Sequence, residues 1–327
     1  MKVRWALVGL LLVAMLALLG CGEADKPAGD EQTGQSVPAK AELRSLEDLS
    51  SYRMRVDTAS GSGEAAVETD ADVEYVREPQ AIRVMFSSPQ DPSGDTEVVR
   101  IGEKTYMGGD MGDGQKTWIL TVGDDPDAVD PYEAVRWADA GTYVSDPGCT
   151  VAGSEQIDGK ATTHYTCGMQ VLQDRELIWQ SGELVEGSVD AWISDELGVP
   201  LKVTAAWSTK DEEGQTLEEV AEASLGEVDV ALTITAPEGE GVPVIPTDVP
   251  VHPQAGSMMI MTDSMFYDVK DATLADVQTF FRDEMAAAGW EVEMDAEGMM
   301  TFTKGEQSAT LMLTEDEGAI AVTLLIE

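Results

Sequence analysis

The stretch Cys149-Thr-Val-Ala-Gly-Ser-Glu-Gln-Ile-Asp-Gly-Lys-Ala-Thr-Thr-His-Tyr-Thr-Cys167 predicts the fold of the region around it. At its centre, Asp158-Gly159 readily takes the positive φ angles of a type I′ turn, and this turn joins two runs with strand character. We therefore expect a β-hairpin that brings Cys149 and Cys167 onto neighbouring strands.

These two cysteines are predicted to form a structural disulfide. Bridging Cys149 and Cys167 would close a loop of about 18 residues, which contributes about 3 kcal/mol to stability. The alternatives are two free thiols or a redox pair, although a redox pair usually has the closer spacing Cys-x-x-Cys.

Short segments with strand character extend on both sides of the hairpin. Their spacing predicts a meandering antiparallel sheet rather than a parallel one. The segments run from Tyr52 to Val56, Ala65 to Val67, Val73 to Tyr75, Ile82 to Phe86, Val98 to Ile101, Thr105 to Met107, Thr117 to Thr121, Val189 to Ile193 and Pro200 to Trp207.

Helices are predicted at a few places between these strands. Leucines at 43, 46 and 49 indicate one stripe of a short helix. Asp130-Pro131 is typical of a helix start, with Glu133 at the capping-box position, and the helix should end near Ala138. Residues 171–180 favour a helix over a strand, and residues 216–235 leave helix and strand open.

The last part of the chain has its own pattern after a linker rich in proline and glycine at 241–253. Met258 to Met261 and Met265 to Tyr267 indicate strands. Thr273 caps a helix with Asp276 at the capping-box position, and Gly289 ends it. Four more strands follow, so residues 254–327 are predicted to be a small α+β domain with one helix on an antiparallel sheet.

The chain begins with a positive start at Lys2 and Arg4 and an apolar run from Ala6 to Leu19. Leu18-Leu19-Gly20-Cys21 resembles the lipobox of bacterial lipoproteins. The resemblance implies a lipoprotein signal peptide at 1–20, acylation of Cys21, for example with palmitate, and a flexible tether over the rest of 21–40. An uncleaved anchor helix is the alternative, but the run is shorter than the roughly 20 residues that a spanning helix needs.

The charge excludes several classes of partner. The chain has 62 acidic and 20 basic residues, for a net charge of −42. Such a field repels nucleic acid and anionic lipid head groups. We favour solubility as its role over a specific cation-binding role.

Two family resemblances follow from these motifs. Residues Ala41 to Pro237 resemble the LolA/LppX-LprG type of lipoprotein, through the lipobox, the early helix, the run of strands and the segments Ile157-Asp158-Gly159 and Ile234-Thr-Ala-Pro237. That resemblance implies a strongly curved antiparallel sheet, a half-barrel with covering helices, around a cavity for lipids or acylated molecules. Ile245 to Glu327 resemble a small domain of poorly characterised bacterial lipoproteins, carried by Pro250-Val-His-Pro and Ala288-Gly289-Trp290.

No motif in the sequence indicates catalysis, a cofactor or a metal. His164 and His252 lack a second ligand at zinc spacing. The acidic loop 123–127 lacks the EF-hand pattern, so we favour a solvated loop over a calcium site. The methionines at 258, 259, 261, 265, 294, 299 and 300 could bind copper(I), but methionine more often fills a core or an adaptable apolar surface.

The expected fold class is therefore α+β, with a curved-sheet domain at 41–240 followed by the small domain at 254–327. The expected function is a lipid-anchored protein on the extracytoplasmic side of the membrane, at the cell surface or in the periplasm, which binds a lipid or acylated ligand and is not an enzyme. The alternative is a surface module for protein–protein interaction or assembly without a ligand cavity. A hydrolase would need a nucleophile or metal site that the sequence does not show.

Overall fold

The computed structural model describes residues 40–61, 66–90, 94–110, 116–123, 130–174, 183–210, 214–239, 241–316 and 318–327. These residues belong to one unit, Lys40–Glu327. The predictions for the signal peptide, Cys21 and most of the tether lie outside the described residues. No helix in the described part of the chain is long and apolar enough to cross a membrane.

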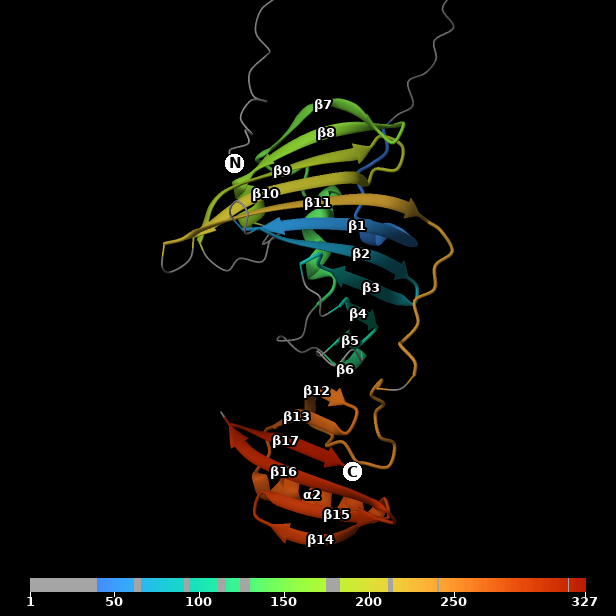
Figure 1. Cartoon of the computed structure of the whole chain (residues 1–327), viewed down its shortest axis with the longest axis vertical. Coiled ribbons are helices and arrows are strands. Elements are labelled where there is room, and N and C mark those ends of the chain that lie inside the picture. The colour runs from blue at the N-terminus through green and yellow to red at the C-terminus, as the bar shows by residue number, and fades with distance from the viewer. Residues whose placement is uncertain are drawn as a thin grey trace, which may run out of the picture. The chain divides into compact units, whose positions relative to one another are not determined.

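Antiparallel strands dominate the described structure, as the sequence predicts (Figure 1). The neighbouring strands pair in the order β7-β8-β9-β10-β11-β1-β2-β3-β4-β5-β6-β12-β13-β17-β16-β15-β14. Their bounds are β1 Ser51–Ser60, β2 Val67–Arg77, β3 Gln80–Ser87, β4 Thr96–Ile101, β5 Lys104–Asp110, β6 Lys116–Val122, β7 Cys149–Ile157, β8 Lys160–Gly168, β9 Glu183–Ser194, β10 Pro200–Lys210, β11 Thr216–Val228, β12 Ala255–Met261, β13 Ser264–Lys270, β14 Glu291–Ala296, β15 Met299–Lys304, β16 Gln307–Asp316 and β17 Ala319–Ile326.

The central hairpin forms as predicted. Asp158 and Gly159 connect β7 to β8 with φ angles of 50° and 77°, the left-handed region that a type I′ turn requires. Cys149 lies directly opposite Cys167 in the antiparallel register, and the two are joined by a disulfide.

The described helices are few, and three of them are short 3-10 helices: η1 Leu46–Asp48, η3 Glu133–Ala138 and η4 Ala140–Thr142. The predicted capping box at Asp130 is wrong. Asp130 Oδ1 accepts from the Tyr132 backbone N–H at 3.0 Å, but Glu133 turns to Arg136 instead. Because this tight turn follows the proline directly, the helix begins at Glu133.

Two α-helices complete the described elements, α1 Met169–Asp174 and α2 Leu274–Ala287. The predicted helix at 171–180 is confirmed at its start, whereas residues 175–182 lie outside the described part. The capping box at Thr273 and Asp276 is confirmed, and Gly289 follows the helix with φ 87°.

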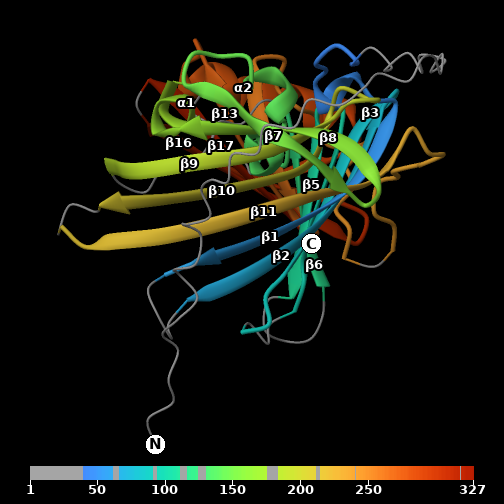
Figure 2. The same cartoon turned by 90° about the horizontal axis from the view of Figure 1, so that it is seen from above.

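The ambiguous region 216–235 contains the strand β11, which lies between β10 and β1 (Figure 2). Its inward residues Ala221, Ala223 and Leu225 are buried against the main core. Two flanking strands therefore satisfy the backbone hydrogen bonds of a segment whose first residues favour a helix by propensity.

Two hydrophobic cores lie on opposite faces of the paired strands. In β3, Val84 belongs to the first core, and its neighbour Arg83 points to the other face. The residues that follow Arg83 across the ladder from β4 to β12 belong to the second core. They are Val99, Tyr106, Leu120 and Ile260, each directly opposite the one before.

The second core therefore combines β4–β6 with the predicted C-terminal domain. α2 covers it through Val277, Phe281 and Met285, which are fully buried. The first core is covered on its own side by η3, which contacts β10, and by η4, which contacts β9 and β10.

Candidate functional site

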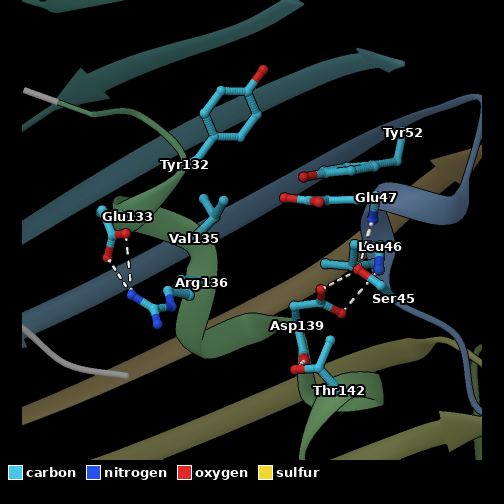
Figure 3. Close-up of a pocket in the computed structure, with 10 residues that line it drawn as sticks. All are labelled: Ser45, Leu46, Glu47, Tyr52, Tyr132, Glu133, Val135, Arg136, Asp139 and Thr142. Carbon is cyan, nitrogen blue, oxygen red and sulfur yellow. Dashed lines mark hydrogen bonds and ion pairs between the residues drawn. The ribbon is translucent and has the colours of Figure 1, made fainter. Parts of the chain in front are cut away.

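An open pocket lies where η1 and η3 meet above strand β1 (Figure 3). It encloses about 900 Å³, part of which is open solvent. Ten residues line it: Ser45, Leu46, Glu47, Tyr52, Tyr132, Glu133, Val135, Arg136, Asp139 and Thr142. We call it the mouth pocket, because it opens beside the first hydrophobic core.

Asp139 fastens the two sides of the mouth pocket together. Its carboxylate accepts a hydrogen bond from Ser45 Oγ at 2.5 Å and one from the Leu46 backbone N–H at 2.9 Å. Burial raises the pKa of Asp139 above its ordinary value, and the two hydrogen bonds oppose that rise. This single side chain therefore satisfies the start of η1 from a segment more than 90 residues away.

Three tyrosines lie on the wall of the pocket and behind it. Tyr52 stacks on Tyr75 with ring centroids 4.9 Å apart, and Tyr132 meets the same ring edge-on at 6.3 Å. Burial raises the pKa of Tyr132 to about 12 and also raises the pKa of Tyr52 and Tyr75. Their hydroxyls stay protonated at neutral pH, so they can orient a ligand but cannot act as bases.

A smaller hollow continues from the mouth pocket into the first core. Leu46 lines both spaces. The inner hollow has about 150 Å³ of empty space and no room for a water molecule. Apart from the rim residues Pro200 and Lys202, its lining is apolar: Leu46, Met54, Ala138, Leu201, Val203, Ala223 and Leu225.

The residues singled out from the sequence lie elsewhere. His164 has its ring nitrogens 2.7 Å from Asp190 Oδ1 and 3.4 Å from Glu155 Oε1, and its ring stacks on Trp192. His252 Nδ1 accepts from the Gln254 N–H, and burial lowers its pKa. Both histidines are held within the surface of a sheet.

The predicted acidic loop and the methionines have different outcomes. Residues 124–127 lie outside the described part of the chain. Met265 and Met300 are buried in the second core, whereas Met259, Met294 and Met299 are exposed. Among the described residues, no group of three or more His, Cys, Asp or Glu is arranged to hold a metal ion.

Sequence reasoning missed the role of Asp139 and Glu47, and it placed Tyr52 and Leu46 only as strand and helix residues. No local pattern marks Asp139, since its partners are Ser45 and Leu46, far away along the chain. Only the folded register of β1 against the 3-10 helices brings these residues together.

Comparisons with known proteins give limited matches. The START domain-like family matches residues 256–318, which is less than half of the chain. Among curated proteins none matches. The resemblance predicted for Ile245 to Glu327 finds no support in these matches.

Solved structures with related folds include lipoproteins of mycobacteria. LppX of Mycobacterium tuberculosis is 13% identical with a TM-score of 0.36, over 58% of this chain and 91% of its own. LprF of Mycobacterium bovis is 19% identical with a TM-score of 0.35, over 59% of this chain and 91% of its own.

The complex of MucA and MucB from Pseudomonas aeruginosa is 11% identical with a TM-score of 0.29, over 86% of this chain and 89% of the matched chain. Because all three TM-scores are low, none of these likenesses carries an argument about function. The function therefore has to be argued from the chain itself.

Proposed function

We propose that this chain is a membrane-anchored envelope lipoprotein that binds a hydrophobic or acylated ligand without catalysis. In this proposal, acyl chains on Cys21 hold the protein on the extracytoplasmic side of the membrane. Residues 22–40 then act as a polar tether to the folded body.

The observation that carries the proposal is the meeting of two spaces at Leu46. The mouth pocket is polar on one side, and the inner hollow behind it is apolar. A ligand with a polar head and an acyl chain has the same two parts. Each methylene that leaves water contributes about 0.8 kcal/mol, so a few carbons provide enough free energy to displace one leucine.

The inner hollow must enlarge to take a chain. Its ceiling is formed by η1 and η3, which are 3 and 6 residues long. Asp139 links them through two hydrogen bonds. Because short 3-10 helices carry few internal hydrogen bonds of their own, we expect this ceiling to shift at modest cost.

Lipid extraction and native mass spectrometry of the protein purified from its membrane test the proposal. We expect a lipid to copurify and to be lost in the variant Leu46→Trp, which fills the passage between the two spaces. Leu43→Trp is the matched control, because Leu43 is exposed on the same segment. A wild-type protein without lipid, which also fails to take up added fatty acid, would contradict the proposal.

The anchor has its own test. Metabolic labelling with an alkyne fatty acid should mark the wild-type chain and leave Cys21→Ala unlabelled, and the variant should leave the membrane fraction. Label that persists in Cys21→Ala would contradict acylation at this cysteine.

The second candidate is a surface module for protein–protein interaction or assembly, with a filled interior. The observation that favours it is the tight packing of the inner hollow, which has no room for water. Cross-linking in intact cells distinguishes the two: a reproducible protein neighbour, together with an absence of bound lipid, would favour this candidate.

A further inference from the structure

The mouth pocket carries negative charge that no described cation neutralises. Glu133 is paired with Arg136 at 3.1 Å. Within the described residues, the carboxylates of Glu47 and Asp139 have no basic partner within ion-pair distance. A charged group that enters this pocket therefore meets two uncompensated carboxyl groups at its wall.

Tyr52 adds an observation that is independent of the acidic residues. Its side chain is almost fully buried, with 2% of the residue exposed. No described residue makes a hydrogen bond to its hydroxyl, although the residue lines the pocket. Figure 3 shows that the hydroxyl and the Glu47 carboxylate point in the same direction, toward the side where Tyr132 lies.

Such a buried hydroxyl usually finds a partner, because leaving it without one costs free energy. The open side of the pocket is where that partner can come from. A ligand group that donates or accepts a hydrogen bond there would satisfy Tyr52 and contact Glu47 together.

The aromatic rings extend the same preference for positive charge. Tyr132 already accepts one cation, since the Arg100 guanidinium carbon lies 5.8 Å from its ring centroid. Aromatic faces attract cations through their quadrupole, and quaternary ammonium groups are bound in proteins by such rings beside carboxylates.

We propose that the mouth pocket binds an organic ammonium group, either the head group of a lipid or a free amine. Glu47 and Asp139 supply the negative charge, and the Tyr52 hydroxyl and the Tyr132 ring contact the ligand. An anionic head group is disfavoured by the same carboxylates. This inference rests on the proposed function for the acyl chain, but not for the head group.

The test uses probes that share one chain and differ in the head. Decyltrimethylammonium, decyl maltoside and decyl sulfate are titrated below their micelle concentrations, and tetramethylammonium is titrated as the head without the chain. Isothermal titration calorimetry on the full-length mature protein measures each affinity at low and at moderate salt. The salt series separates a local site from the general attraction of a strongly acidic chain for cations.

We expect decyltrimethylammonium to bind about tenfold more tightly than decyl maltoside, and decyl sulfate to bind most weakly. Glu47→Gln and Tyr52→Phe should each weaken the cationic probe several-fold. Glu315→Gln is the matched control, because it removes the same charge from an exposed position on β16. It should leave the affinity unchanged. Circular dichroism and urea titration confirm that each variant folds.

The outcomes separate this inference from the proposed function. Equal affinities for the three amphiphiles would overturn the ammonium site and leave acyl binding in place. Binding of tetramethylammonium as tightly as the amphiphile would support the site and identify a free amine as its ligand. No binding of any probe would overturn both. An equal loss in Glu315→Gln and Glu47→Gln would overturn the site, because the whole field would then be responsible.

Discussion

At the scale of single residues, Asp139 links the sequence to the candidate site. Burial raises the pKa of its carboxyl group in the folded state. Folding therefore favours the protonated form, and the stability that this group contributes is full below the ordinary carboxyl pKa of about 3.9. That stability is lost as pH rises through the raised native value.

The variant Asp139→Asn should remove this pH dependence. It keeps the shape of the side chain and an acceptor for the Leu46 N–H, but it carries no charge. Relative to the wild type, we expect its free energy of unfolding to be more favourable at about pH 7.5 than at about pH 5. Urea denaturation at the two pH values measures this difference.

Ser45→Ala provides the opposite change. The hydrogen bond from Ser45 lowers the pKa of Asp139, so its removal should raise that pKa further and increase the loss of stability toward high pH. The explanation by burial would be contradicted if the two variants changed the pH dependence in the same direction.

The Asp139 linkage lies beyond sequence reasoning for a physical reason. Its bond to Ser45 joins positions 94 residues apart, and neither residue stands in a pattern that periodicity or capping rules detect. Thr273 and Asp276, by contrast, are three residues apart and follow a local capping rule, so that site is predicted from the sequence and confirmed.

At the scale of elements, β5 shows how one glycine sets the packing between two strands. The Trp118 ring on β6 lies over Gly108, and a Cβ at this position would lie 2.6 Å from the ring. The next residue, Gly109, would place its Cβ in ordinary contact, 3.5 Å from Thr96 Oγ1.

Gly108→Ala should therefore destabilise the fold by about 1–3 kcal/mol, because the Trp118 ring has to move. Gly109→Ala is the matched control and should cost well under 1 kcal/mol, since its neighbours need not shift. Urea denaturation, followed by tryptophan fluorescence, compares the two. Equal losses would show that strand propensity rather than the ring determines the effect.

The hairpin disulfide is the second test at this scale. The double variant Cys149→Ser, Cys167→Ser should lose about 3 kcal/mol of stability, because it frees a loop in the unfolded chain. Reduction of the wild type with dithiothreitol should give a similar loss and should leave the double variant unchanged. A stable, unaffected double variant would mean that β-pairing alone holds β7 on β8.

At the scale of the whole described unit, the strands alternate as predicted, but the change of core face at β4 does not follow from alternation. Val99, Tyr106 and Leu120 fit a period of two equally well on either face. The pairing of β6 with β12 decides which face is covered, and that pairing joins Leu120 to Ile260 across 140 residues of sequence. Local patterns therefore predict each strand and not the side on which it is buried.

This change of face leaves methionines on the open side of the last strands. Met299 lies directly opposite Met312, and both are exposed, whereas Met300 points to α2 and is fully buried. Dilute hydrogen peroxide should therefore oxidise Met299 and Met312 well before Met300, because a buried thioether is protected.

Peptide mass spectrometry over a time course gives the three rates in one sample. The pair Met299 and Met300 is its own control, since the two residues are adjacent in sequence and differ in exposure from 39% to 0%. In urea the two rates should become equal, because unfolding exposes both. Equal rates in the folded protein would contradict the assignment of Met300 to the second core, and with it the change of core face between the two halves of the sheet.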